Sequence, residues 1–287
     1  MCRVVDVRQA VLAKNDALAD ALRKDLTARG TVVVTLLSSP GSGKTALLEQ
    51  ILARTIARGV PAAALTADLA TENDATRLAR SGAPVKQVLT GGLCHLEAAQ
   101  LRAHLEGWLP EGTRVLYVEN VGNLVCPASY DLSETLRITL MSVTEGEDKP
   151  LKYPAAFGLA HLVVLTKTDI AQAVGFDRPA FVRNVARINP GVGIAETSAR
   201  TGEGVEALVE QVLAVVEGGG VHQPAMAAAR PVTADAQGHK HEHEHGNGHE
   251  HVHGGHAHGH APGPLHEAPH LSPVRLRAPE DPAVPRP

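Results

Sequence analysis

Residues 32–45 read VVVTLLSSPGSGKT, and this stretch decides the fold. Its first half is β-branched and apolar, as expected of a buried parallel strand. The run stops at a turn of serine, proline and glycine, after which residues 46–52 (ALLEQIL) have helical spacing. A strand, a glycine-containing loop, Gly-Lys-Thr and a helix in this order predict a phosphate-binding P-loop.

The residue types of this loop suit a bound phosphate chain. Gly41 and Gly43 let the main chain approach an anion, toward which backbone N–H groups and the positive end of the following helix point. Lys44 brings a charge to the β- and γ-phosphates, and the Thr45 hydroxyl can hold Mg²⁺. Ser38 stands where the motif usually has its first glycine. The predicted phosphate contacts are Gly41, Ser42, Gly43, Lys44 and Thr45.

Composition excludes several classes of protein. The 287 residues carry a formal net charge of −4, so no basic excess points to a nucleic-acid partner. Three cysteines cannot build a disulfide framework, which favours a reducing cytoplasm. We find no signal peptide and no apolar run of membrane-spanning length, and we therefore expect no membrane association.

Apolar runs alternate with helical patterns along most of the chain. Predicted strands lie at 60–68, 85–89, 114–120, 136–143, 162–165 and 193–196, and predicted helices at 9–28, 75–80, 96–105 and 204–216. This alternation predicts an α/β fold of the P-loop NTPase class, with a mostly parallel sheet and helices on both faces. Ligands bind such sheets at the carboxyl ends of the strands.

Two carboxylates end predicted strands that could flank the P-loop strand. Glu119 follows an apolar run, in the place of the acid that holds Mg²⁺ or its water in P-loop proteins. Asp68 is the second candidate, either for Mg²⁺ or for orienting the attacking water. We predict that Lys44, Asp68 and Glu119 act in catalysis; the alternative for either acid is a helix cap or a surface position.

A second motif favours guanine over adenine. The strand at 162–165 runs into Thr166-Lys167-Thr168-Asp169, a variant of the base-reading motif N-K-x-D with threonine in place of asparagine. Asp169 can accept two hydrogen bonds from guanine, and the stem of Lys167 can lie across the base. About thirty residues later, a loop with Ser198 and Ala199 fits the segment whose backbone N–H meets the guanine O6. The sequence therefore predicts GTP.

Cys94, His95 and Cys126 form a candidate metal site. Thiolates and an imidazole suit Zn²⁺ or Ni²⁺. Three ligands are too few for a closed tetrahedral site, which a water or a second copy across a two-fold axis could complete. The alternative is a buried small cysteine beside a histidine at a helix start. Cys126 follows the loop 119–123, which we expect to move on hydrolysis, and this position favours coupling of metal to nucleotide.

A histidine-rich segment lies near the C-terminus. Such a sequence cannot build a core, so we expect disorder unless metal organises it. Its imidazoles can bind several Ni²⁺, Zn²⁺ or Cu²⁺ ions, which favours storage or buffering. A purification tag is the alternative, but the run is mixed in composition and 27 residues follow it. The histidines are His239, His241, His243, His245, His249, His251, His253, His256, His258 and His260.

Three stretches together resemble the HypB GTPases of [NiFe]-hydrogenase maturation. They are residues 38–45, 119–127 (ENVGNLVCP) and 148–154 (DKPLKYP), and the likeness covers roughly residues 1–216. The resemblance implies a GTPase that forms a nucleotide- or metal-dependent homodimer and works with a zinc-containing partner, HypA. It also implies a metal site at Cys94, His95 and Cys126, and a nucleotide or dimer contact at Lys152.

The chain departs from this family in two places. Some members carry an N-terminal cysteine-rich nickel site, whereas only Cys2 lies in that region here. The histidine-rich stretch, which in the family is more often near the N-terminus, here follows the nucleotide-binding domain. Its storage role is therefore inferred from its chemistry.

These observations lead to a predicted function and domain division. We expect a lead-in helix (1–29), a P-loop GTPase domain with a metal site (30–217) and a metal-binding tail (218–287). The predicted activity is GTP-dependent nickel delivery to a hydrogenase large-subunit precursor, with GTP, Mg²⁺, Ni²⁺ and Zn²⁺ as cofactors. The alternatives are urease nickel insertion and a metal-storage protein whose GTPase is vestigial.

Overall fold

The structure, a computed structural model, describes residues 3–68 and 73–227, with side chains at 9–67 and 74–227. In this part of the chain seven parallel strands form one sheet in the order β3-β2-β4-β1-β5-β6-β7. The strands are β1 (Val32–Leu37), β2 (Ala62–Asp68), β3 (Val85–Leu89), β4 (Val115–Glu119), β5 (Leu136–Ser142), β6 (Leu162–Thr166) and β7 (Gly193–Glu196). The predicted parallel α/β fold is confirmed.

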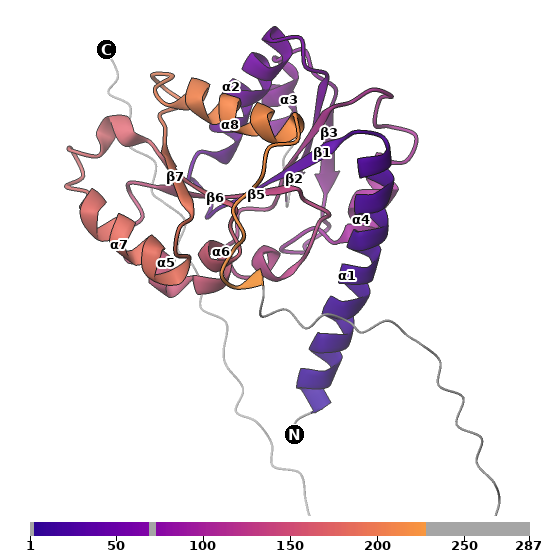
Figure 1. Ribbon diagram of the computed structural model, residues 1–287, viewed down its shortest axis with the longest axis horizontal. Coiled ribbons are helices and arrows are strands. Elements are labelled where there is room, and N and C mark those ends of the chain that lie inside the picture. Colours follow the sequence, from indigo (N-terminus) through magenta and orange to yellow (C-terminus); the bar gives the residue numbers. More distant parts are fainter. Residues whose placement is uncertain (1–2, 69–72, 228–287) are drawn as a thin grey trace, which may run out of the picture. The chain divides into compact units, whose positions relative to one another are not determined.

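Helices and short 3-10 turns connect these strands (Figure 1). The helices are α1 (Arg3–Ala28), α2 (Lys44–Ala57), α3 (Asn73–Ala79), α4 (Ala98–Leu105), α5 (Lys149–Lys152), α6 (Pro154–Gly158), α7 (Arg178–Ile188) and α8 (Val205–Val216). The 3-10 turns are η1 (Pro127–Ser129) and η2 (Thr168–Ile170).

Helices cover both faces of the sheet because alternate residues of each strand point to opposite sides. Val34 of β1 packs with α2 and α8, whereas Val33 packs with α1 and α4. Helices α6 and α7 extend the second layer over β5 and β6. Leu48 and Ile51 of α2 are fully buried, and each such side chain contributes about 1.5–3 kcal/mol.

Helix α1 packs beside α4, as expected of a helix on the side of the domain (Figure 1). It begins at Arg3, six residues before the predicted start. Its buried Leu22 and Leu26 join the apolar cluster of the second layer. It also contacts the chain before β5, since the Ser133 hydroxyl donates to the Ala19 carbonyl at 2.8 Å.

The strand order corrects one expectation about the two carboxylates. β1 pairs with β4 and β5, so Glu119 at the end of β4 lies next to the P-loop strand. Asp68 ends β2, which pairs with β3 and β4 instead. One strand therefore separates Asp68 from the P-loop strand, because the chain leaving α2 passes beyond the position that β4 later fills.

The chain after Glu217 continues along the domain as far as residue 227. Asn189, fully buried at the end of α7, accepts hydrogen bonds from His222 Nε2 at 2.9 Å and from the Ala225 N–H at 3.2 Å. The Met226 N–H donates to the Gly158 carbonyl at 3.1 Å. These contacts join residues 222–226 to the domain, although the predicted tail begins at 218.

Candidate functional site: a nucleotide pocket and a thiol-imidazole cluster

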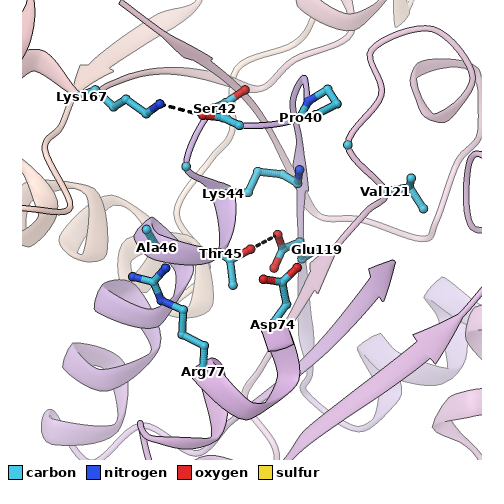
Figure 2. Close-up of a pocket in the computed structure, with 13 residues that line it drawn as sticks. Pro40, Ser42, Lys44, Thr45, Ala46, Asp74, Arg77, Glu119, Val121 and Lys167 are labelled. Atoms are coloured by element: carbon cyan, nitrogen blue, oxygen red, sulfur yellow. Dashed lines mark hydrogen bonds between the residues drawn. The ribbon is translucent and has the colours of Figure 1, made fainter. Parts of the chain in front are cut away.

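The P-loop forms the floor of a pocket of about 550 Å³ (Figure 2). Gly41 (φ +74°) and Gly43 (φ +90°) adopt left-handed conformations that other residues avoid, and α2 begins directly after Gly43. The backbone N–H groups at the start of α2 lack helical partners and suit an anion. The pocket is lined by Pro40, Gly41, Ser42, Gly43, Lys44, Thr45, Ala46, Asp74, Arg77, Glu119, Val121, Gly122 and Lys167.

Glu119 is brought onto Thr45 by the pairing of β4 with β1. The Thr45 hydroxyl donates to Glu119 Oε1 at 2.7 Å, and the Thr66 hydroxyl donates to Oε2 at 3.3 Å. The carboxyl is 3% exposed, and burial raises its pKa although the nearby Lys44 charge opposes this shift. A buried carboxylate and a hydroxyl that converge beside a phosphate site are the oxygen donors that Mg²⁺ prefers.

Two further side chains of α3 line the pocket and were not predicted. The carboxyl group of Asp74 lies beside that of Glu119, and its charge also raises the pKa of Glu119 (Figure 2). Arg77 points toward the start of α2 and forms an ion pair with Glu49. The side chain of Asp68 lies outside the described residues. Since α3 follows β2 within a few residues, the polar run after Asp68 was the available signal for these positions.

The segment at the end of β6 contacts the P-loop directly. Lys167, at φ 58°, donates from Nζ to the Gly41 carbonyl at 2.7 Å. The hydroxyl of Thr166, which replaces the usual asparagine, donates to the Ser42 carbonyl at 2.6 Å. The threonine hydroxyl therefore connects the base-reading segment to the phosphate loop by a hydrogen bond.

Asp169 contacts the loop after β7, which brings the two predicted base-reading motifs together. Its Oδ1 accepts from the Ser198 hydroxyl at 2.7 Å and its Oδ2 from Arg200 Nε at 2.9 Å. The Ser198 hydrogen bond, followed by that of Arg200, lowers the pKa of Asp169 below its usual value. Ser198 is fully buried and Ala199 half-buried beside it. An ionised carboxylate at this position is the acceptor that guanine N1–H and its amino group require.

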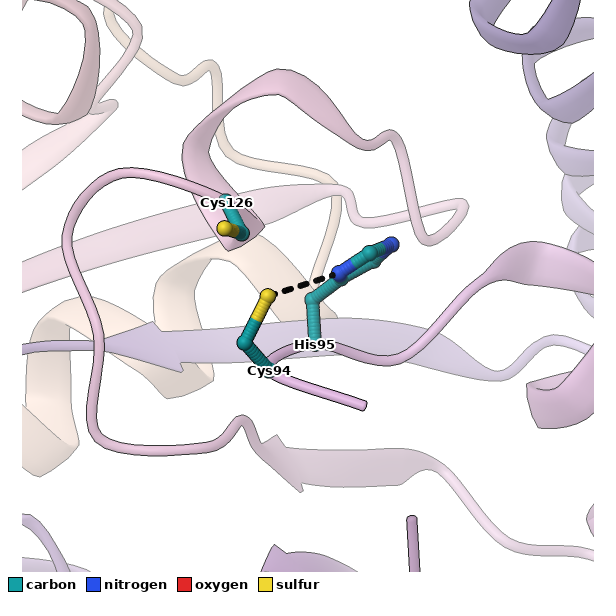
Figure 3. A group of neighbouring side chains, drawn as sticks. All are labelled: Cys94, His95 and Cys126. Atoms are coloured by element: carbon teal, nitrogen blue, oxygen red, sulfur yellow. Dashed lines mark hydrogen bonds between the residues drawn. The ribbon is translucent and has the colours of Figure 1, made fainter. Parts of the chain in front are cut away.

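Cys94, His95 and Cys126 converge, and their ligand atoms all lie within 4.8 Å of one another (Figure 3). Cys94 Sγ lies 3.5 Å from His95 Nδ1. Cys126 precedes η1 and comes from the loop that leaves β4, whereas the other two come from the turn between β3 and α4. The alternative of an isolated buried cysteine does not describe this arrangement of two thiols around one imidazole.

The electrostatics of this cluster suit a soft divalent cation. The Cys126 thiol, together with burial, raises the pKa of Cys94. Burial lowers the pKa of His95 and outweighs the attraction of Glu97, whose Oε1 lies 3.6 Å from His95 Nε2. A neutral imidazole and two thiols that lose protons on binding are the donor set of zinc and nickel sites.

Two residues next to the His95 imidazole, Tyr130 and Glu97, were not predicted as part of this site. The Tyr130 ring lies against the His95 ring with centroids 3.9 Å apart. Glu97 caps α4 in a capping box with Gln100 while facing His95 Nε2. Glu97 is thus placed for the carboxylate contact that orients histidine ligands in metal sites. The pattern E-x-x-Q at residues 97–100, which spans the start of α4, was the available sequence signal for this cap.

The loop after β4 joins the two sites. Gly122 lines the nucleotide pocket, and a Cβ there would lie 3.1 Å from Pro40 Cα, so this loop packs directly against the P-loop. Four residues later the same loop supplies Cys126. The histidines of the tail, His239 to His260, lie outside the described residues.

Residues 32–196 match the family model described as the CobW/HypB/UreG nucleotide-binding domain. The hydrogenase maturation factor HypB of Rhizobium leguminosarum bv. viciae is 42% identical over 205 residues, which cover 71% of this chain and 68% of that protein. HypB of Escherichia coli (strain K12) is 45% identical, with coverage of 71% and 70%. The chain belongs to the HypB family.

Solved HypB structures have the same fold. HypB from Archaeoglobus fulgidus aligns with a TM-score of 0.66 at 36% identity and covers 71% of this chain and 100% of its own. HypB from Helicobacter pylori, solved in complex with nickel, aligns with a TM-score of 0.67 at 35% identity, covering 73% and 99%. None of the helices at 3–68 and 73–227 combines the length and apolar character needed to cross a membrane.

Proposed function

We propose that this HypB-family protein is a GTP-hydrolysing metallochaperone that delivers nickel during [NiFe]-hydrogenase maturation. One observation carries the proposal: the loop that lines the phosphate pocket at Gly122 also supplies Cys126 to the thiol-imidazole cluster. A change at the γ-phosphate therefore acts on a segment that holds a metal ligand. The relatives named as hydrogenase maturation factors, and the one solved with nickel, support this assignment.

The pocket residues have distinct proposed roles in hydrolysis. Thr45 and Glu119 would hold Mg²⁺, which neutralises charge on the phosphates when bound. Lys44 stabilises the transferred phosphoryl group, and Asp68 orients the attacking water. Asp169, Lys167 and the Ser198–Ala199 backbone select guanine. Support comes from the Thr45–Glu119 contact and from the meeting of Asp169 with the loop after β7.

The cluster is proposed to hold the cargo ion. Three protein ligands leave a position for a water or for a ligand from a second copy, which fits a homodimer that forms with metal or nucleotide. Nickel is the proposed cargo and zinc a competing occupant, since both accept thiolate and imidazole. A HypA-like chaperone and the hydrogenase large-subunit precursor are the proposed partners, in the cytoplasm, and Lys152 is proposed to contact either the nucleotide or the second copy.

Titration with Ni²⁺ in the presence of a GTP analogue, GDP or no nucleotide tests the proposal. We expect one tight site per subunit whose affinity changes with the nucleotide. Cys126→Ala should abolish that site while GTP affinity stays unchanged. Equal nickel affinity in all three states, with an unchanged assembly state, would remove the coupling and with it the proposed delivery.

The tail is proposed to store nickel. Deleting residues 238–260 should lower the nickel stoichiometry several-fold and leave GTP hydrolysis intact, because imidazoles in this run can bind several ions. The readout is bound nickel per chain after dialysis. Loss of both properties together would show that the segment belongs to the fold instead.

Urease maturation is a second candidate. One relative, the hydrogenase/urease maturation factor HypB of Helicobacter hepaticus, is 38% identical over 205 residues and is covered to 84%. Deleting the gene in its host and measuring both nickel enzymes separates the two. Loss of urease with retained hydrogenase activity would favour the second candidate.

A further inference from the structure

Two buried asparagines hold the turn that carries Cys94 and His95, which we call the metal turn. The turn runs into α4, whose N-cap is Glu97. The Leu96 N–H lies just before this cap and the Ala98 N–H belongs to the first helical residue, so neither has a partner within the helix. The Leu96 N–H donates to Asn120 Oδ1 at 3.2 Å. The Ala98 N–H donates to Asn15 Oδ1 at 2.9 Å. The two amides thus bind the same turn, one from α1 and the other from the loop after β4.

Asn120 belongs to the nucleotide side of the molecule. It is 1% exposed and lies between Glu119 and Val121, which both line the phosphate pocket. Its N–H donates to the Leu36 carbonyl of β1 at 3.2 Å, and its Oδ1 also accepts from the Val121 N–H at 2.9 Å. Within the described residues its Nδ2 has no hydrogen-bond partner. Its oxygen is therefore the atom that joins the loop after β4 to the metal turn.

Asn15 belongs to α1, away from the pocket. It is 5% exposed, and its Nδ2 donates to the Asp131 carbonyl at 2.9 Å while its Oδ1 accepts from Ala98. Asp131 follows Tyr130, whose ring lies on His95. Arg23, also on α1, donates to both carboxylate oxygens of Asp131 at 2.6 and 2.7 Å. Asn15 therefore bridges the two segments around the cluster without touching any residue of the pocket.

From this arrangement we infer that Asn120 is the positioning residue that transmits the nucleotide state to the metal turn, whereas Asn15 holds the same turn independently of nucleotide. The inference rests on the proposed nucleotide-gated delivery and names the contact responsible. A shift of Glu119 moves the adjoining Asn120, whose oxygen then moves the Leu96 N–H and the neighbouring His95. The Asn15 contact has no such link to the pocket and sets affinity alone.

The test compares nickel affinities of the full-length chain bound to a GTP analogue and to GDP. The Ni²⁺–thiolate charge-transfer absorption reports cysteine-bound ion, so histidines of the tail give no signal, and a Cys2→Ser background leaves only the cluster thiols. Since the tail competes equally in both states, its effect cancels in the ratio of the two affinities. Coupling is reciprocal, so adding Ni²⁺ must change the ratio of the GTP-analogue and GDP affinities by the same factor.

Three variants separate the roles. Asn120→Leu should bring the affinity ratio to about one, with nucleotide affinity in the absence of metal close to wild type. Asn120→Asp keeps an acceptor oxygen and should retain the ratio. Asn15→Leu should lower nickel affinity in both states by about 10–100-fold, because its amide holds the turn that orients the ligands, and leave the ratio unchanged.

The outcomes are distinct. A wild-type ratio of one overturns the proposed delivery mechanism, and the inference with it. A normal wild-type ratio that persists in Asn120→Leu overturns the inference alone. A ratio lost equally in Asn15→Leu shows a general loosening of the turn and also overturns it. If the leucine variant of Asn120 does not fold, Asn120→Ala, which leaves space instead of bulk, carries the same test.

Discussion

The phosphate pocket and the thiol-imidazole cluster are neighbours that are built in opposite ways. The floor of the pocket comes from one continuous stretch, residues 40–46, whose backbone N–H groups at the start of α2 suit an anion. The cluster takes Cys94 and Cys126 from two loops that are 32 positions apart, and side chains form all of it. A backbone site is encoded locally, whereas a side-chain site exists only once distant loops are held together.

The support around each site differs in the same way. Thr166 and Lys167 hold the P-loop through its own carbonyl groups, so the loop is braced within the sheet. The metal turn depends on Asn15 and Asn120, single side chains from a helix and from another loop. We therefore expect substitutions in the pocket to change nucleotide chemistry in the absence of metal, and substitutions around the cluster to change metal affinity in the absence of nucleotide.

The largest expected effect is that of Lys44→Ala. Removing the charge beside the transferred phosphoryl group should lower GTP hydrolysis by about 100-fold or more. Nickel affinity without nucleotide should remain unchanged, because the cluster uses no atom of this residue. Steady-state phosphate release and a nickel titration on one preparation check both. Hydrolysis at the wild-type rate would show that another cation of the pocket, such as Arg77, stabilises the transferred phosphoryl group.

Asp169→Asn tests the base-reading end of the pocket. Loss of two hydrogen bonds to a charged acceptor should weaken GTP binding by about 100-fold and improve binding of xanthosine triphosphate. Arg200→Ala is the matched control, since it removes a partner of Asp169 but leaves the carboxylate. The measurement is nucleotide affinity by calorimetry, and GTP affinity equal to wild type would take Asp169 out of base reading.

The metal cluster should respond to pH near neutrality. The pKa of Cys94 is raised by Cys126, so the thiol is protonated below that pKa and a metal ion must displace the proton. Affinity should therefore rise with pH, about tenfold per unit for each proton released. Because burial lowers the pKa of His95, its imidazole is already neutral near pH 7 and adds no further dependence there. Nickel affinity should be measured from about one pH unit below to about one unit above pH 7.5. An affinity that does not change over this range would contradict thiolate ligation.

The smallest expected effect is that of Glu97→Gln. Losing the carboxylate 3.6 Å from His95 Nε2 should weaken nickel binding by about tenfold, the lower end for such partners, since the side chain is 39% exposed. Glutamine can still accept at the start of α4, so the cap survives. Glu106→Gln, at the other end of the same helix, is the control. Equal losses in both variants would point to net charge as the cause.

Sequence patterns predicted the strands closely but missed part of the helical layer. The predicted strands at 85–89 and 193–196 coincide with β3 and β7. Helix α7 was not predicted, although Asp177 caps it by accepting from the Ala180 N–H at 2.9 Å and Phe181 and Val185 are buried one turn apart. Its apolar positions are few, and a proline near its start obscured the helical pattern.

The order of the strands in the sheet could not be predicted from the sequence, for a physical reason. A buried parallel strand is apolar on both faces wherever it lies, so composition does not tell an inner from an outer position. Pairing alone placed Glu119 beside Thr45 and put Asp68 one strand farther away. The same limit applies to Asn15 and Asn120, because no local sequence pattern predicts which N–H groups their amides accept from.

The sequence by itself determined the P-loop and predicted the guanine motifs and three candidate metal ligands, because their residue types suit phosphate, guanine and a soft cation. Only the tertiary structure decided that Cys94, His95 and Cys126 meet, that Thr166 replaces asparagine as a tie to Ser42, and that two asparagines hold the metal turn. Such contacts join residues far apart in the chain, and their geometry follows from how the loops leave the sheet.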